Sequence, residues 1–99
     1  MYLVDLNFTD MSKITPALTE QHKKYLEQQY QSNLLMFGGR KVPRTGGLLI
    51  SAHPTKEELV DVLASDPFIQ SGAASYVITE FIPVMASERY ADIVERVGP

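Results

Sequence analysis

The first part of the chain alternates between hydrophobic and polar positions with a period of two. The apolar set is Tyr2, Val4, Leu6 and Phe8, and the positions between them form a mixed set that includes Asp5. Successive side chains of a strand point to opposite faces of a sheet, so this alternation predicts a strand over residues 2–8 with one apolar face. An acidic residue this early, with no basic segment before it, favours a strand over a signal peptide.

Helical periodicity replaces the alternation after Thr15. Thr15 can cap a helix, and Pro16 suits the first helical position, where its missing N–H costs nothing. Large side chains then recur three or four residues apart, at Leu18, His22, Tyr25, Leu26 and Tyr30. This spacing predicts an amphipathic helix that runs to about Gln31.

Two short apolar runs follow, at residues 34–37 and 47–52. The connection between them, residues 38–46, holds three glycines, one proline and two arginines. Glycine and proline are typical of turns, so the runs predict an antiparallel pair of strands.

The next segment has the signals of a second helix and of a short turn after it. Thr55 and Glu58 fit a capping box, in which each residue satisfies a free N–H of the first helical turn. The helical pattern is interrupted at residues 65–68. There, Asp66 can cap a short further turn with Pro67 at its first position.

The remaining chain predicts one more strand and one more helix. Residues 75–82 are rich in tyrosine, valine, isoleucine and phenylalanine, which favours a fourth strand that stops at Pro83. The tail from Ser87 has apolar residues at helical spacing. It predicts a third helix, which packs either on the body of the protein or on a partner.

The predicted order, βαββαβ with a C-terminal helix, is that of an α+β, ferredoxin-like fold. At 99 residues the chain is expected to form a single domain, with a core over residues 1–83 and a helical tail over residues 84–99. Two helices cover one face of such a sheet and leave the other bare. A homodimer would cover a bare face that carries residues such as Leu3.

Composition and charge exclude several classes of partner and chemistry. The net charge is −3 and no cluster of basic residues exceeds one lysine pair, so nucleic acid is not an expected partner. No apolar run is long enough to span a membrane. The chain has no cysteine, and its histidines and carboxylates lack metal-ligand spacing, so we expect no metal. No phosphate-binding loop suggests a nucleotide cofactor. The cytoplasm is the default location.

Four segments, taken in order and spacing, resemble the YCII-related family: Leu18–Leu26, Pro43–Gly47, Ser65–Phe68 and Tyr76–Phe81. The resemblance covers roughly residues 1–83. It implies a dimeric α+β barrel with a His22–Asp66 pair in a cleft. Most members have no assigned reaction, and a few relatives act as lyases or dehydrochlorinases on ring compounds. The chain departs from the family at Gly38, followed here by glycine where the family often has proline, and in its tail helix.

His22 and Asp66 are the candidates for catalysis. Histidine changes charge near neutral pH and so suits general acid/base work, and a carboxylate on one imidazole nitrogen would fix the tautomer and stabilise the imidazolium. A different interpretation stays open for each residue. His22 lies on the apolar stripe and could be a core histidine bonded to a carbonyl, and Asp66 could be only a helix cap. Both roles of Asp66 could coexist, with one oxygen capping and the other facing His22.

Other side chains are weaker candidates for ligand binding. Arg40 and Arg44 flank the glycine-rich connection and could clamp a carboxylate or phosphate, although a solvated arginine is the simpler interpretation. Tyr25 could line a cleft for a small aromatic ligand or belong to the core. His53 precedes a proline and is expected to be a loop residue.

Three functional hypotheses follow from these candidates. The first is a cofactor-free enzyme of lyase or isomerase type, in which His22 and Asp66 transfer protons on a small ring substrate. The second is a non-catalytic dimeric module that binds a small, anionic or aromatic ligand or assists another enzyme. The third is a purely structural dimer whose His–Asp contact is a buried polar link.

Overall fold

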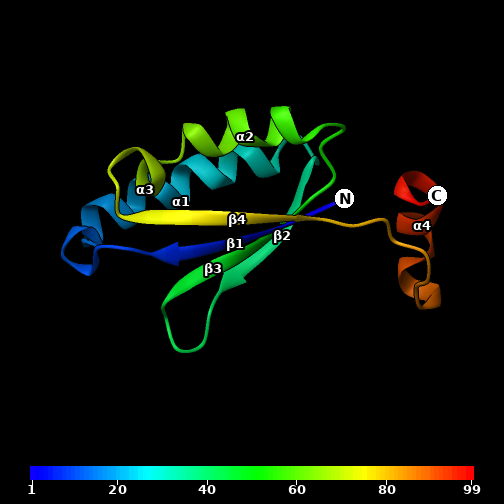
Figure 1. The fold of residues 1–99 in the computed structure, drawn as a ribbon, viewed down its shortest axis with the longest axis horizontal. Helices are drawn as coiled ribbons and strands as arrows, with labels where there is room; N and C mark the ends of the chain where they lie inside the picture. Colours follow the sequence, from blue (N-terminus) through cyan, green and yellow to red (C-terminus); the bar gives the residue numbers. More distant parts are fainter.

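The computed structural model describes residues 1–99 as a four-stranded sheet with helices on one face and a C-terminal helix set apart from it (Figure 1). Two single 3₁₀ turns, η1 (Met11–Lys13) and η2 (Glu88–Tyr90), accompany these elements. None of the helices is long and apolar enough to cross a membrane. The strands and helices are β1 (Tyr2–Phe8), α1 (Pro16–Tyr30), β2 (Leu35–Arg40), β3 (Gly46–Ser51), α2 (Lys56–Ala64), α3 (Pro67–Gln70), β4 (Ala74–Glu80) and α4 (Ala91–Val97).

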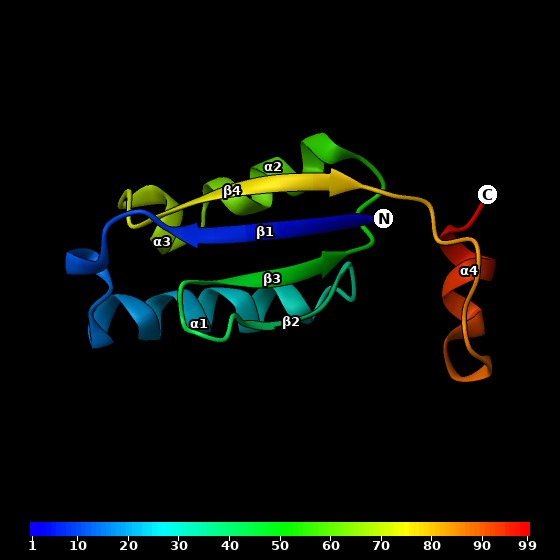
Figure 2. The same cartoon turned by 60° about the horizontal axis from the view of Figure 1, so that its bottom comes forward.

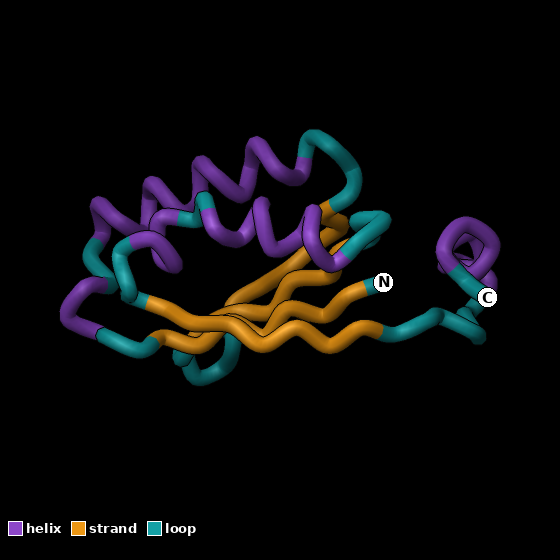
Figure 3. The backbone as a smooth tube through the Cα atoms, turned by 45° about the horizontal axis from the view of Figure 1, so that its top comes forward, coloured by secondary structure: helices purple, strands orange, loops and turns teal.

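All strand pairs in the sheet are antiparallel, in the order β2-β3-β1-β4. β1 is therefore a central strand, and its register pairs Tyr2 with Ser51 at one end and Asn7 with Gly46 at the other. Helices α1, α2 and α3 all lie on the same side of the sheet (Figures 1 and 3). This arrangement confirms the predicted α+β, ferredoxin-like fold.

The helix starts follow the capping signals of the sequence. The Thr15 hydroxyl accepts the Leu18 N–H at 3.1 Å, with Pro16 at the first position of α1. The Thr55 hydroxyl accepts the Glu58 N–H at 3.2 Å and opens α2. The other half of the predicted capping box, a bond between the Glu58 side chain and the Thr55 backbone N–H, does not form.

The second strand extends further than the hydrophobic pattern predicts. β2 continues through Gly38 and Gly39 to Arg40, where the sequence analysis expects a turn. Backbone pairing explains the difference, because Gly39 lies opposite Leu48 and Arg40 opposite Gly47 in the ladder with β3. A strand needs backbone hydrogen bonds, which glycine makes as well as any residue. β2 therefore continues although its hydrophobic side chains stop at Phe37.

The hydrophobic core lies between the helices and the face of the sheet that they cover. Its fully buried side chains include Val4 from β1, Leu35 from β2, and Leu59 and Leu63 from α2. Val4 belongs to the alternating pattern of the first strand, and Leu35 belongs to the short apolar run at residues 34–37. Only 14 of 99 residues are buried, because one face of the sheet has no cover and the C-terminal segment lies apart.

The uncovered face of the sheet is apolar over much of its area. We call it the bare face, and its apolar residues are Leu3, Phe37, Leu48, Ile50 and Val77. Phe37 and Val77 are 62% and 63% exposed. At the hairpin end the face becomes polar, where Lys41 pairs with Asp5 at 2.5 Å.

The C-terminal segment leaves the body of the protein at the end of β4. We call residues 81–97 the arm. The arm continues beyond the end of β4, turns at η2 and ends in α4. This helix lies apart from α1, α2 and α3 (Figures 1 and 2). The tail helix was expected to pack either on the body of the protein or on a partner, and in the structure it does not pack on the body of its own chain.

Candidate functional site

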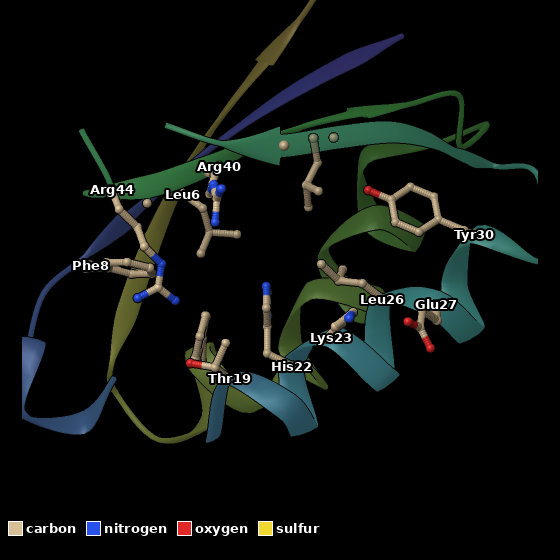
Figure 4. A pocket seen from close by; sticks show the side chains of 16 residues that line it. Leu6, Phe8, Thr19, His22, Lys23, Leu26, Glu27, Tyr30, Arg40 and Arg44 are labelled. Carbon is tan, nitrogen blue, oxygen red and sulfur yellow. The ribbon is translucent and has the colours of Figure 1, made fainter. Parts of the chain in front are cut away.

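A cavity of about 500 Å³ opens between the covered face of the sheet and α1 (Figure 4). Its walls come from β1, α1, both strands of the β2–β3 hairpin and α3. Glycines at positions 38, 39, 46 and 47 form the hairpin wall, so backbone rather than side chains borders the space there. A β-carbon on Gly38 would lie 2.5 Å from the Leu48 carbonyl oxygen and 2.8 Å from the Tyr30 hydroxyl, so this position has no room for a side chain unless its neighbours move.

His22 projects from the middle of α1 into this cavity (Figure 4). Its Nδ1 lies 2.8 Å from Oδ1 of Asp66, and the side chains are 19% and 0% exposed. Because a carboxylate oxygen accepts the bond, Nδ1 is the donor. The other ring nitrogen, Nε2, is then the basic atom available to a ligand.

Asp66 is held by its role at the start of α3. Its Oδ1 also accepts the Phe68 N–H at 2.8 Å, so it caps this short helix with Pro67 at the first position, as predicted. If both predicted roles of Asp66 coexist, one oxygen would cap the helix and the other would face His22. Instead Oδ1 serves both, and the buried Oδ2 has no hydrogen-bond partner.

Aromatic rings fix the orientation of the imidazole. The His22 ring stacks on Phe68, with centroids 4.0 Å apart and planes inclined by 15°. Phe68 in turn meets Phe8 edge to face at 5.5 Å. These contacts restrict rotation of the His22 side chain about its bonds, and the bond to Asp66 fixes its tautomer.

Three cationic side chains line the same cavity. Arg40 and Arg44 reach it from the hairpin, and Lys23 reaches it from α1, with Glu27 as the single lining carboxylate. The Arg44 guanidinium lies 5.4 Å from the centroid of the Phe8 ring, within the range of a cation–π contact. None of the three cations forms an ion pair with a carboxylate of the protein, so their charges face the cavity uncompensated by a direct partner.

Tyr25 is not among the residues that line the cavity, and its role as a ligand contact stays a prediction. Its hydroxyl donates to the backbone carbonyl of Val62 and so ties α1 to α2. Burial, and after it the charge of Asp66, raises the pKa of Tyr25 to about 12. Five residues further along α1, Tyr30 does line the cavity, and burial raises the pKa of its phenol as well.

Residues that the sequence analysis did not select also shape the site. Phe8 ends the alternating strand on the same face as Leu6, so the period of two could have placed it. Phe68 directly follows the Asp66-Pro67 cap and could have been inferred from it. Lys23 had no signal, because its neighbours on α1 predicted a solvated position.

His53 forms a second histidine site, at the opposite end of the β1–β3 ladder. Its Nδ1 lies 2.6 Å from the Ser51 hydroxyl, which also accepts the His53 backbone N–H at 3.1 Å. Burial lowers the pKa of His53, against a smaller opposing effect of Glu58. The residue does lie in a loop, as predicted, but it is only 6% exposed and is not on the cavity wall.

A helix-covered antiparallel sheet with a histidine–carboxylate pair at an open cavity defines an α+β protein of the ferredoxin-like class. The chain belongs to the YCII-related family, because its sequence matches the YCII-related domain over residues 5–82. The match ends at residue 82, within the first two residues of the arm. A search of curated proteins gave no match to the sequence.

Among solved structures, the chain is similar to 5-chloro-2-hydroxyhydroquinone dehydrochlorinase (TftG) from Burkholderia phenoliruptrix AC1100. That structure is a complex with 2,5-dihydroxybenzoquinone. The similarity has a TM-score of 0.56 at 18% sequence identity and covers 82% of this chain and 93% of that one. At this identity the comparison supports the fold and leaves the reaction to be argued from the residues.

Proposed function

We propose that the protein is a small-molecule enzyme in which His22 is the general acid/base and Asp66 positions it. The observation that carries the proposal is the 2.8 Å bond from His22 Nδ1 to a fully buried carboxylate, made at the wall of an open cavity. This bond leaves Nε2 free for the substrate. The carboxylate stabilises the imidazolium that forms when Nε2 takes a proton.

The lining of the cavity favours a planar, anionic substrate. Arg40, Arg44 and Lys23 supply positive charge from two walls, and arginine can bind two oxygens of one anionic group. Phe8 and Phe68 supply flat apolar surface beside the imidazole. A ring compound that carries ionised hydroxyl or carboxylate groups combines both properties.

Proton transfer alone supports two types of reaction on such a ring. In an elimination, Nε2 takes a proton from the substrate, the released electron pair forms a new double bond, and a leaving group departs with its own electron pair. In an isomerisation, the imidazolium returns the proton at a different atom. Neither reaction changes the oxidation state of the protein or needs a bound metal or organic cofactor. The structural neighbour is a dehydrochlorinase of a hydroxylated ring, which is consistent with the first type.

We also propose that the enzyme acts as a homodimer. The bare face exposes Phe37, Leu48 and Val77 on a sheet whose other face is covered, and a second sheet packed on it would remove them from water. Sedimentation equilibrium at micromolar concentration should give twice the chain mass. A monomer at these concentrations would exclude the dimer without bearing on the chemistry of His22.

Ligand binding can be tested by NMR with 2,5-dihydroxybenzoquinone as the probe. The chain has only two histidines, so their ring C–H signals are readily separated. The probe should shift the signal of His22 and leave that of His53 unchanged. Arg44→Gln should weaken binding about ten-fold, the loss expected for one charge-assisted hydrogen bond. The matched control is Lys56→Gln at the start of α2, an exposed cation outside the cavity wall, the bare face and the arm, which should bind as the wild type does.

Turnover can be tested with 5-chloro-2-hydroxyhydroquinone and related halogenated ring compounds, with released halide as the readout. His22→Ala should lower the rate by about 10²–10⁴-fold, the usual contribution of a general acid/base. Binding of such ring anions without release of halide or proton exchange would favour the alternative of a ligand-binding module. Equal shifts of both histidines on addition of the probe would exclude this cavity as the site.

A further inference from the structure

The arm presents a dense run of exposed apolar side chains. Of the eleven large hydrophobic residues that the chain exposes, five lie within residues 81–90: Phe81, Ile82, Val84, Met85 and Tyr90. Val84 and Met85 are 62% and 88% exposed. Within the arm, α4 only half-buries its own apolar residues, so folding the arm on itself does not remove this surface from water.

The arm and the bare face adjoin one another. The Phe81 N–H donates to the Met1 carbonyl at 2.9 Å, which extends the ladder between β1 and β4 by one step. Side chains two residues apart on a strand share a face, so Phe81 points to the same side as Val77. The exposed apolar surface therefore continues from the sheet into the arm.

The exposed area of the whole chain exceeds that of an average monomer by nearly the area that one partner buries in a standard interface. The chain exposes 6387 Å², about 700 Å² more than a folded monomer of 11.1 kDa exposes on average. The radius of gyration is 14.1 Å, against about 12.6 Å for a folded domain of this length. A standard interface removes about 800 Å² from each partner.

We propose that the arm crosses to a second copy of this chain and packs against it, as an extension of the interface made by the bare face. In a dimer with two-fold symmetry, a single interface buries the bare face and the arm of both copies. A different protein would need complementary surfaces for both the sheet and the arm. The proposal rests on the homodimer argued above, and it is independent of whether His22 is catalytic.

Matched substitutions of two exposed methionines test the proposal in the full-length chain. Met85→Asp places a charge on the arm, and Met11→Asp makes the same change in η1, outside the bare face and the arm. Both side chains are exposed in the isolated chain, at 88% and 59%, so neither change should prevent folding. Met85→Asp should raise the dissociation constant of the dimer at least ten-fold in sedimentation equilibrium, and Met11→Asp should leave it unchanged.

Cross-linking shows which chain the arm contacts. The sequence contains no cysteine, so Met85→Cys provides a unique attachment point for a benzophenone maleimide. Irradiation should give a covalent two-chain product on a denaturing gel, whereas Met11→Cys labelled in the same way should give almost none. A dimer that is unaffected by Met85→Asp, a cross-linker that reacts only within one chain, or a monomeric wild type would each overturn the proposal.

Discussion

The two histidines of the chain make similar hydrogen bonds at opposite ends of the same sheet, and their surroundings give them different roles. Both bond an oxygen through Nδ1, at 2.8 Å for His22 and 2.6 Å for His53. The partner of His22 is a buried carboxylate, and its ring borders a cavity with three uncompensated cations. The partner of His53 is a neutral hydroxyl, and its ring is enclosed.

The difference shows that a histidine's hydrogen bond does not by itself identify a catalytic residue. A carboxylate partner stabilises the charged imidazolium, which a general base must become, whereas a hydroxyl in a closed site stabilises the neutral ring. Access matters equally, because a base must reach its substrate. His22 meets both conditions and His53 meets neither, so we expect substitutions of the two residues to have separable effects.

Truncation of the enclosed histidine should have the largest effect on stability. His53→Ala removes an imidazole that is 6% exposed, and it leaves the buried Ser51 hydroxyl without a partner for its remaining bond. We expect the free energy of unfolding to fall by about 2–4 kcal/mol. Urea denaturation followed by circular dichroism measures the loss. A change below experimental error would mean that the ring is not part of the core.

Neutralising the carboxylate should change the activity of one histidine only. Asp66→Asn preserves the shape and much of the capping ability of the residue but removes the charge that stabilises the His22 imidazolium. The rate of halide release should fall by at least about ten-fold, equivalent to about 1.4 kcal/mol of lost transition-state stabilisation. The NMR signal of the His22 ring C–H should also shift relative to that of His53, which serves as the internal reference. An unchanged rate would show that the charge of Asp66 does not support His22.

Truncation of the cavity-lining histidine should have a smaller effect on stability. His22→Ala removes a ring that borders an open cavity, so water can enter and hydrate the carboxylate of Asp66. We expect a loss of about 1 kcal/mol in the free energy of unfolding, an ordinary value for a point substitution. Urea midpoints of His22→Ala and His53→Ala, compared directly, give the contrast. Equal losses would mean that His22 is a core residue as well.

The smallest expected effect concerns the pH dependence of stability. Burial lowers the pKa of His53, so the unfolded chain binds a proton at this residue more readily than the folded chain does. This contribution to stability is therefore fully present above the pKa of the unfolded histidine, about 6.5, and is lost as the pH falls through the folded pKa. Thermal unfolding between pH 7.5 and 5.5 should show a decline that is shallower in His53→Gln. A steeper decline in the variant would contradict the sign.

Local signals predicted most of the fold, because each acts within one element. The alternation at Tyr2, Val4 and Leu6 identified the covered face of β1, and Thr15, Thr55 and Asp66 each capped the helix that they were predicted to begin. Such patterns depend on neighbours in the sequence. The end of β2 was missed, because pairing of Gly39 and Arg40 with β3 depends on backbone bonds that side-chain patterns do not record.

The candidate site was predictable only in part, because it is assembled from distant segments. The family resemblance indicated that His22 and Asp66 belong together, and the structure brings them within hydrogen-bond distance. Helical spacing could not distinguish Tyr25, which bonds α2, from Tyr30, which lines the cavity. His53 was correctly assigned to a loop, but nothing in its local sequence indicates that Ser51 and the core enclose it.

The double use of Oδ1 in Asp66 has a consequence for how the family diverges. Asparagine or serine at this position would still accept the Phe68 N–H and begin α3, so the fold would tolerate either residue. Only a carboxylate of this length both caps the helix and holds a charge against His22. A homologue that keeps the histidine but has serine or asparagine in place of the aspartate would retain the fold and lose the charged partner. The identity of this one residue could therefore separate enzymes from ligand-binding members within the same family.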